Sequence, residues 1–209
     1  MKKYLVEFIG TFFLVFTVGM TVSQGVAMAP LAIGASLMIM VYMGGHISGA
    51  HYNPAVSVAV FMRGKITGGE LMQYIVAQNL GALAAAFLAY IIVGKAVGPA
   101  PAAGVSMTAA LLTEILYTFA LALVVLNVAV AAKTQGNSFY GLAIGFTIAV
   151  AAFAGGGISG GAFNPAVGTG LNLVNCLVAG GALGHLWLYW VGPIVGGALA
   201  AVVFGIQEE

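Results

Sequence analysis

Long runs of apolar residues, separated by short polar or glycine-rich breaks, make up nearly the whole chain. Six runs are long enough to cross the roughly 30 Å hydrocarbon core of a bilayer, which takes about 20 helical residues. Two further apolar segments, at 53–62 and 164–174, are too short for a full crossing. The pattern therefore predicts six transmembrane helices and two half-helices. The expected full spans are 4–22, 29–46, 70–93, 107–130, 138–156 and 184–206.

The two short segments begin with nearly the same residues. Ile-Ser-Gly and Asn-Pro-Ala-Val occur within 47–56 and again, at a constant offset of about half the chain, within 158–167. Asn is a favoured helix N-cap because its side-chain oxygen accepts from a free backbone N–H, and Pro suits the first helical position. One such joint would be ordinary in a soluble protein. Two at matching places in so apolar a chain predict a repeated unit.

Other features repeat with these segments. Glu7 and Glu114 stand near the start of the first and fourth spans, each followed four residues later by Thr. Each half has three spans and one half-span, so the halves enter the membrane from opposite sides and form an inverted repeat. We expect a single transmembrane domain over 1–209, with repeats at about 1–96 and 107–209.

Composition indicates an integral membrane protein. Charged residues are 5% and hydrophobic residues 62% of the chain, too few charges to cover the surface of a soluble fold. The net charge of +1 gives no basic face for nucleic acid. With both termini in the cytoplasm, only Lys95 lies outside, as the positive-inside rule favours. The cytoplasmic basic residues are then Lys2, Lys3, Arg63, Lys65 and Lys133.

The half-helices give the topology a function. About ten residues at 1.5 Å rise reach roughly 15 Å, half of the hydrocarbon core, so two from opposite faces meet near the midplane. Their N-termini, with Asn53 and Asn164, then face each other. Unwound backbone at membrane depth is tolerated only where it lines water or is buried in protein. The meeting point therefore predicts a pathway for something polar.

The twin Asn-Pro-Ala boxes, the Gly-His-Ile-Ser-Gly-Ala-His run at 45–51 and the paired Glu-x-x-x-Thr starts resemble the aquaporin (major intrinsic protein) family over nearly the whole chain. The resemblance implies an all-α, aquaporin-like membrane fold and a homotetramer with one pore per subunit. It implies no catalysed reaction. We expect no cofactor, and no metal site either, because the sequence offers no third ligand beside His46 and His51. The pore motifs are Asn53, Pro54, Ala55, Asn164, Pro165 and Ala166, and the pore-lining carbonyls are those of Gly49, Ala50, His51, Gly160, Gly161 and Ala162.

Such a pore discriminates by charge. Each half-helix puts roughly half a positive charge at its N-terminus, so two pointing at one spot oppose cations, including hydronium, while neutral molecules pass. Asn53 and Asn164 could donate to a passing oxygen and turn a water away from its neighbours, which would interrupt a proton wire.

The outer constriction departs from the family pattern. Family members usually have Arg directly after the second Asn-Pro-Ala, and Val167 stands there. The Asp that follows this Arg in aquaglyceroporins is replaced by Gly168. We therefore expect a wide, apolar outer mouth that passes water and small uncharged solutes such as glycerol, urea, ammonia or dissolved gas. By resemblance, the constriction positions are Ile33, Ala152, Gly161 and Val167.

Carboxylates within membrane spans are costly, so the first hypothesis for them is a direct role in function rather than in structure. The twinned positions of Glu7 and Glu114 favour a structural role instead, in which each accepts hydrogen bonds from the loop behind a half-helix. By resemblance His51 faces the inner half of the pore, whereas His46 is expected to be packed. Gln78 is expected to form a hydrogen bond between helices or between subunits.

Several functions stay open at this point. The channel could serve mainly a solute such as glycerol, urea, ammonia or a gas, with little selectivity for water. A secondary transporter also uses inverted repeats and broken helices, although it usually needs more coupling carboxylates. A nonconducting structural membrane protein is a third alternative. No nucleophile–base pair indicates an enzyme. The expected partners are water, small neutral solutes and the lipid of the plasma (cell inner) membrane.

Overall fold

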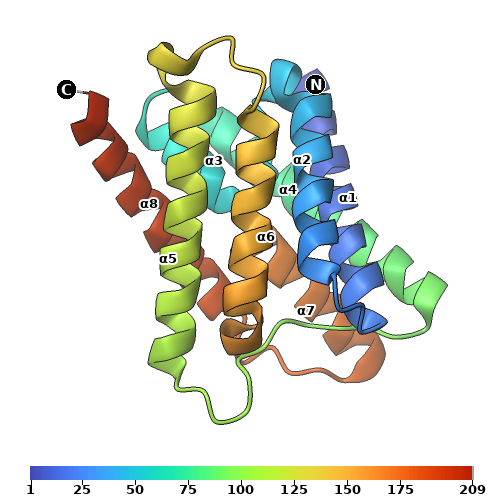
Figure 1. The fold of residues 1–209 in the computed structure, drawn as a ribbon. Helices are drawn as coiled ribbons and strands as arrows, with labels where there is room; N and C mark the ends of the chain where they lie inside the picture. Colours follow the sequence, from blue (N-terminus) through green and yellow to red (C-terminus); the bar gives the residue numbers. More distant parts are fainter. Residues whose placement is uncertain (209) are drawn as a thin grey trace.

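The computed structural model describes residues 1–208, which form an all-helical bundle (Figure 1). Six segments are long and apolar enough to cross a membrane. They are α1 (Lys2–Ser23), α2 (Ala29–Ser48), α4 (Gly68–Val93), α5 (Met107–Val125) with the π-helical turn η1 (Leu126–Val130), α6 (Tyr140–Ser159) and α8 (Leu188–Glu208). The two short helices are α3 (Pro54–Met62) and α7 (Pro165–Ala179), and η2 (Ala132–Thr134) is a single 3-10 turn.

The predicted fold class, with six spans and two half-helices, is confirmed, and every boundary except the end of α7 lies within about four residues of the expected one. Helix α7 runs five residues beyond the expected end at 174. The glycine that caps its C-terminus is Gly180, which has a left-handed φ of +69°. Helix α3 ends at Met62, just before Gly64 with φ +68°. The expected span 107–130 changes from α-helix to a π-turn at Leu126.

Small residues bring equivalent helix pairs together. A side chain at Gly81 of α4 would collide with the backbone of Phe8 in α1, and one at Gly196 of α8 would collide with the backbone of Ile115 in α5. Close backbone approach at small residues is the usual way in which membrane helices associate. The pairs α1 with α4 and α5 with α8 are accordingly the most extensive in the bundle.

The two half-helices lie toward opposite ends of the bundle. Figure 1 shows α3 toward the end where both termini lie and α7 toward the other end. Together with the matching helix pairs, this arrangement supports our proposal that about 1–96 and 107–209 are inverted repeats within one domain.

We expect Gly81→Val to destabilise the protein, because the new side chain would force α4 away from the α1 backbone. Overpacking of this kind costs about 1–3 kcal/mol. The matched control is Gly157→Val in α6, where an added Cβ meets nothing within 4 Å. Thermal unfolding of the two purified variants in detergent checks the prediction, and equal melting temperatures would contradict it.

Candidate functional site

Both half-helices start with the capping geometry that their sequences predict. Asn53 and Asn164 precede α3 and α7 in extended backbone, and Pro occupies the first helical position of each. The Oδ1 atom of Asn53 accepts from the backbone N–H of Ala55 at 2.9 Å, and that of Asn164 accepts from Ala166 at 2.9 Å. Each cap satisfies an otherwise free N–H at the helix start.

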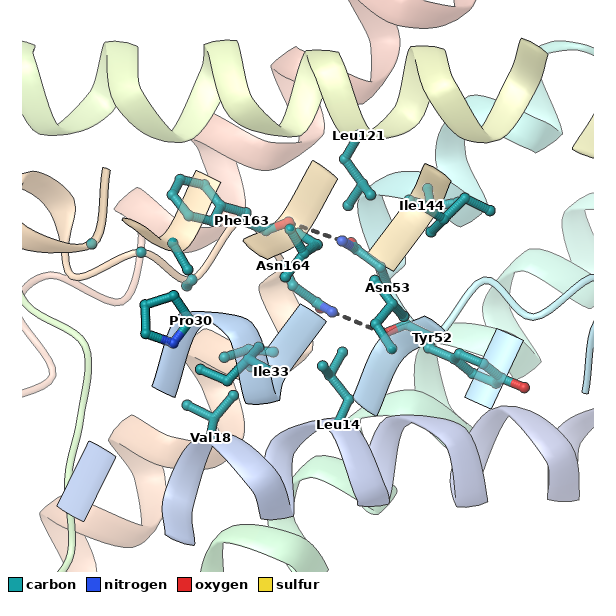
Figure 2. Close-up of a pocket in the computed structure, with 18 of the residues that line it drawn as sticks. Leu14, Val18, Pro30, Ile33, Tyr52, Asn53, Leu121, Ile144, Phe163 and Asn164 are labelled. Atoms are coloured by element: carbon teal, nitrogen blue, oxygen red, sulfur yellow. Dashed lines mark hydrogen bonds between the residues drawn. The ribbon is translucent and has the colours of Figure 1, made fainter. Parts of the chain in front are cut away.

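The two caps also hold each other's loops. Asn53 Nδ2 donates to the carbonyl oxygen of Phe163 at 2.9 Å, and Asn164 Nδ2 donates to that of Tyr52 at 2.8 Å (Figure 2). The N-termini of α3 and α7 are thus cross-linked inside the bundle. Since an amide nitrogen carries two N–H groups, one on each Asn remains to donate to a passing molecule.

The residues that supply these carbonyls are Tyr52 and Phe163, which sequence reasoning missed. Both have φ of +50°, in the left-handed region that non-glycine residues rarely adopt. The Tyr52 ring lies where a side chain at Gly10 or Gly44 would be, and its hydroxyl donates to Met40 O at 2.9 Å. The signal in the sequence is an aromatic residue directly before Asn in both copies.

Two buried carboxylates fix the loops in this conformation. Glu7 accepts from the backbone N–H groups of His51 at 2.9 Å and Tyr52 at 2.7 Å. Glu114 accepts from those of Ala162 at 3.0 Å and Phe163 at 2.7 Å. Both carboxylates are fully buried, and neither lines the central cavity described next. Further donors are Ser48 and Gln78 to Glu7, and Ser159 to Glu114.

A cavity of about 250 Å³, the central cavity, runs past the two Asn side chains. This is room for several waters, each of which takes about 30 Å³ in the liquid. Hydrocarbon side chains of α1, α2, α5 and α6 line it, with Leu121 and Ile144 on one side of the Asn pair and Leu14 on the other (Figure 2). The loops 51–53 and 160–164 supply its polar lining. All four expected constriction positions line it: Ile33, Ala152, Gly161 and Val167. In the part of the chain that the structure describes, no carboxylate, Lys or Arg lines it.

A second cavity of about 330 Å³, the inner vestibule, lies next to the start of α1 and the end of α3. Lys3, Lys65, Tyr74 and Gln135 are among its lining residues. The expected pore-lining carbonyl residues divide between the cavities. His51, Gly160, Gly161 and Ala162 line the central cavity, Gly49 and His51 line the vestibule, and Ala50 lines neither.

Comparison with known proteins identifies the architecture. The sequence matches the family model "Major intrinsic protein" over residues 1–204. The chain belongs to the major intrinsic protein family. It is similar to aquaporin Z of Bradyrhizobium diazoefficiens, at 35% identity over 100% of this chain and 94% of the relative. It is also similar to glycerol uptake facilitator protein-like 6 of Lactiplantibacillus plantarum, at 36% identity over 96% of this chain and 95% of the relative.

A solved structure supports the same fold. The X-ray structure of the aquaglyceroporin from Plasmodium falciparum has a TM-score of 0.87 and 24% identity, and covers 97% of this chain and 94% of its own. Members of this family are passive channels, so the protein is not an enzyme but an integral membrane channel for water or small solutes such as glycerol. Family membership thereby favours a channel over a transporter or scaffold.

We predict that Glu114→Ala severely destabilises the protein. The change leaves the hydroxyl of Ser159 and the backbone N–H groups of Ala162 and Phe163 without their acceptor. Each unpaired buried donor costs about 1–3 kcal/mol. The yield of folded, monodisperse protein is the measurement, with Glu208→Ala, at an exposed position, as control. The same yield for both variants would show that the carboxylate does not hold the loop.

Proposed function

We propose that this protein is a passive channel that conducts water together with small uncharged solutes such as glycerol, urea or ammonia, or a dissolved gas, and that excludes ions. The observation that carries the proposal is the central cavity, which passes the two cross-linked Asn side chains. Its outer part is lined by Ile33, Ala152, Gly161 and Val167, which are neither charged nor aromatic.

Exclusion of ions follows from the two helix starts. Each contributes roughly half a positive charge, and both point at the place where Asn53 and Asn164 meet. A cation there is repelled, and any ion also loses its hydration shell against the hydrocarbon wall without receiving enough replacement ligands. A neutral molecule pays far less, because the free amide N–H groups and the loop carbonyls take over its hydrogen bonds.

Passage of solutes follows from the mixed lining of the central cavity, which combines hydrocarbon side chains with polar loop backbone. A small polyol or urea can place its C–H or flat faces on the hydrocarbon wall and its polar groups on the carbonyls of Gly160, Gly161 and Ala162. With Val167 in place of an Arg, no guanidinium narrows the mouth or competes for those carbonyls. This apolar mouth is also the observation that favours the alternative function, a solute channel with little selectivity for water.

We further propose that the channel lies in the plasma (cell inner) membrane with both termini cytoplasmic. Lys3 and Lys65 line the inner vestibule, next to the start of α1, and Arg63 lies beside Gly205 near the end of α8, so basic side chains gather at the termini's end of the bundle, as the positive-inside rule favours. The exposed hydrocarbon faces of α5 and α6, with Leu116, Phe146 and Val150, would be covered by lipid and by neighbouring subunits of a homotetramer.

Stopped-flow light scattering of proteoliposomes tests the proposal against a panel of water, urea, glycerol and ammonia. We expect faster flux than in protein-free liposomes for water and for the small solutes, without saturation and without dependence on an ion gradient. Fast water flux with every larger solute excluded would contradict the proposed passage of small solutes. No flux of any kind from a well-folded protein would contradict the channel.

We predict that Val167→Arg lowers the flux of glycerol and urea severalfold and lowers any proton leak. Arg adds bulk at the outer mouth, donors that compete for the permeant and a positive charge facing the helix starts. The control Val167→Met adds length without charge, so it should lower solute flux but leave the proton leak unchanged. If Val167→Arg alters neither the solute flux nor the proton leak, the outer mouth does not lie at this residue.

A further inference from the structure

The central cavity and the inner vestibule share two lining residues, His51 and Val125. The two cavities therefore adjoin at these side chains, and we call this place the neck. Both are buried within the bundle, His51 at 6% exposed and Val125 at 5%. The expected outer constriction positions, by contrast, line the central cavity alone.

The imidazole of His51 is held by two contacts of its ring, and a third contact fixes its backbone. Its Nδ1 atom lies 3.0 Å from Ser57 Oγ, its ring meets that of Tyr74 edge-on with centroids 5.0 Å apart, and its backbone N–H donates to Glu7. Ser57 Oγ in turn accepts from Gln78 Nε2 at 3.0 Å. The ring cannot swing away from the neck without breaking a buried polar network, which is costly.

The other side of the neck is set by a break in helix α5. Val125 is the last α-helical residue, and the π-turn η1 begins at the next one. The turn is stabilised from outside, since Asn137 Nδ2 donates to Val128 O at 2.7 Å and Thr134 Oγ1 donates to Asn127 O. Single π-turns are rare in proteins, and those that occur are often found at functional sites.

The outer half of the channel lacks the equivalent groups. The offset of the Asn-Pro-Ala boxes pairs His51 with Ala162 and Ser57 with Gly168. In α4 and α8 the register follows from Tyr74 and Tyr189, whose hydroxyls donate to the matching carbonyls of Ser48 and Ser159. That register pairs Gln78 with Pro193. The repeat is therefore broken where the ring and its two supports would stand, so only the inner half can form a neck of this kind.

We propose that the neck between His51 and Val125 is the selecting constriction of this channel, and that Ser57 and Gln78 are positioning residues that hold the ring there. The inference rests on the proposed function, because it concerns what limits flux through the same pathway. Solutes enter the apolar outer mouth with little discrimination and are sorted by width at the neck. Water, ammonia, urea and glycerol pass, and longer polyols such as erythritol are held back in the central cavity.

The test uses matched Val→Ala changes in proteoliposomes. Val125→Ala widens the neck, whereas Val18→Ala removes the same atoms at the equivalent place of the other repeat, on the wall of the central cavity. We expect Val125→Ala to raise the flux of erythritol relative to water at least about threefold and Val18→Ala to leave this ratio unchanged. If the erythritol-to-water flux ratio is the same in both variants while water flux is intact, the neck is not the selecting constriction. The proposed channel function is unaffected by that result. A wild-type protein without water flux overturns the proposed function itself.

A second pair of variants tests the support of the ring. Ser57→Ala removes the hydroxyl beside His51 Nδ1, and Ser57→Thr retains it. We expect Ser57→Ala to raise the erythritol-to-water ratio about twofold while Ser57→Thr keeps the wild-type ratio. The ratio is read at matched amounts of folded protein, so a loss of stability alone does not change it. A wild-type ratio in Ser57→Ala would show that the hydroxyl does not position the ring.

Discussion

The reciprocal hydrogen bonds between Asn53 and the Phe163 carbonyl, and between Asn164 and the Tyr52 carbonyl, are the constraint on which the rest of the structure depends. They hold two helix N-termini together in the interior of an apolar bundle, where the positive ends of the two helix dipoles face each other and would otherwise repel. Each Asn also caps its own helix, so a single side chain orders one half-helix and the loop of the other. The arrangement leaves one amide N–H per Asn for the pathway.

The loops that present these carbonyls are strained and need outside support. Tyr52 and Phe163 both adopt positive φ, which costs roughly 1–3 kcal/mol each. Glu7 and Glu114 offset this by accepting two backbone N–H groups apiece from the same loops. The carboxylates thus act behind the pathway rather than in it. The helices around them contribute the hydrocarbon wall, and the small residues Gly81 and Gly196 allow the close packing that seals it.

The fold, the two half-helices and their Asn caps could be predicted from the sequence, because short stretches of sequence determine them. Their capping residues are adjacent in sequence, and their length against the bilayer sets where they meet. The reciprocal hydrogen bonds could not be predicted, because they join residues half a chain apart. Their acceptors are backbone carbonyl groups, which every residue has whatever its side chain. The neck was missed for a similar reason: it depends on a π-turn after Val125 and on Gln78, which reads in sequence as an ordinary interhelical donor. Repeat symmetry was the signal that could have revealed it, through the positions where the copies differ.

The central claim is that the cross-linked Asn pair lies on the permeation pathway. A high-resolution structure of the protein in lipid, with its ordered solvent, tests this most directly. The account predicts a continuous file of solvent through the central cavity, with one oxygen at about 2.7–3.2 Å from the Nδ2 atoms of Asn53 and Asn164. A dry junction at the Asn pair, with solvent crossing the bundle elsewhere or not at all, would contradict it.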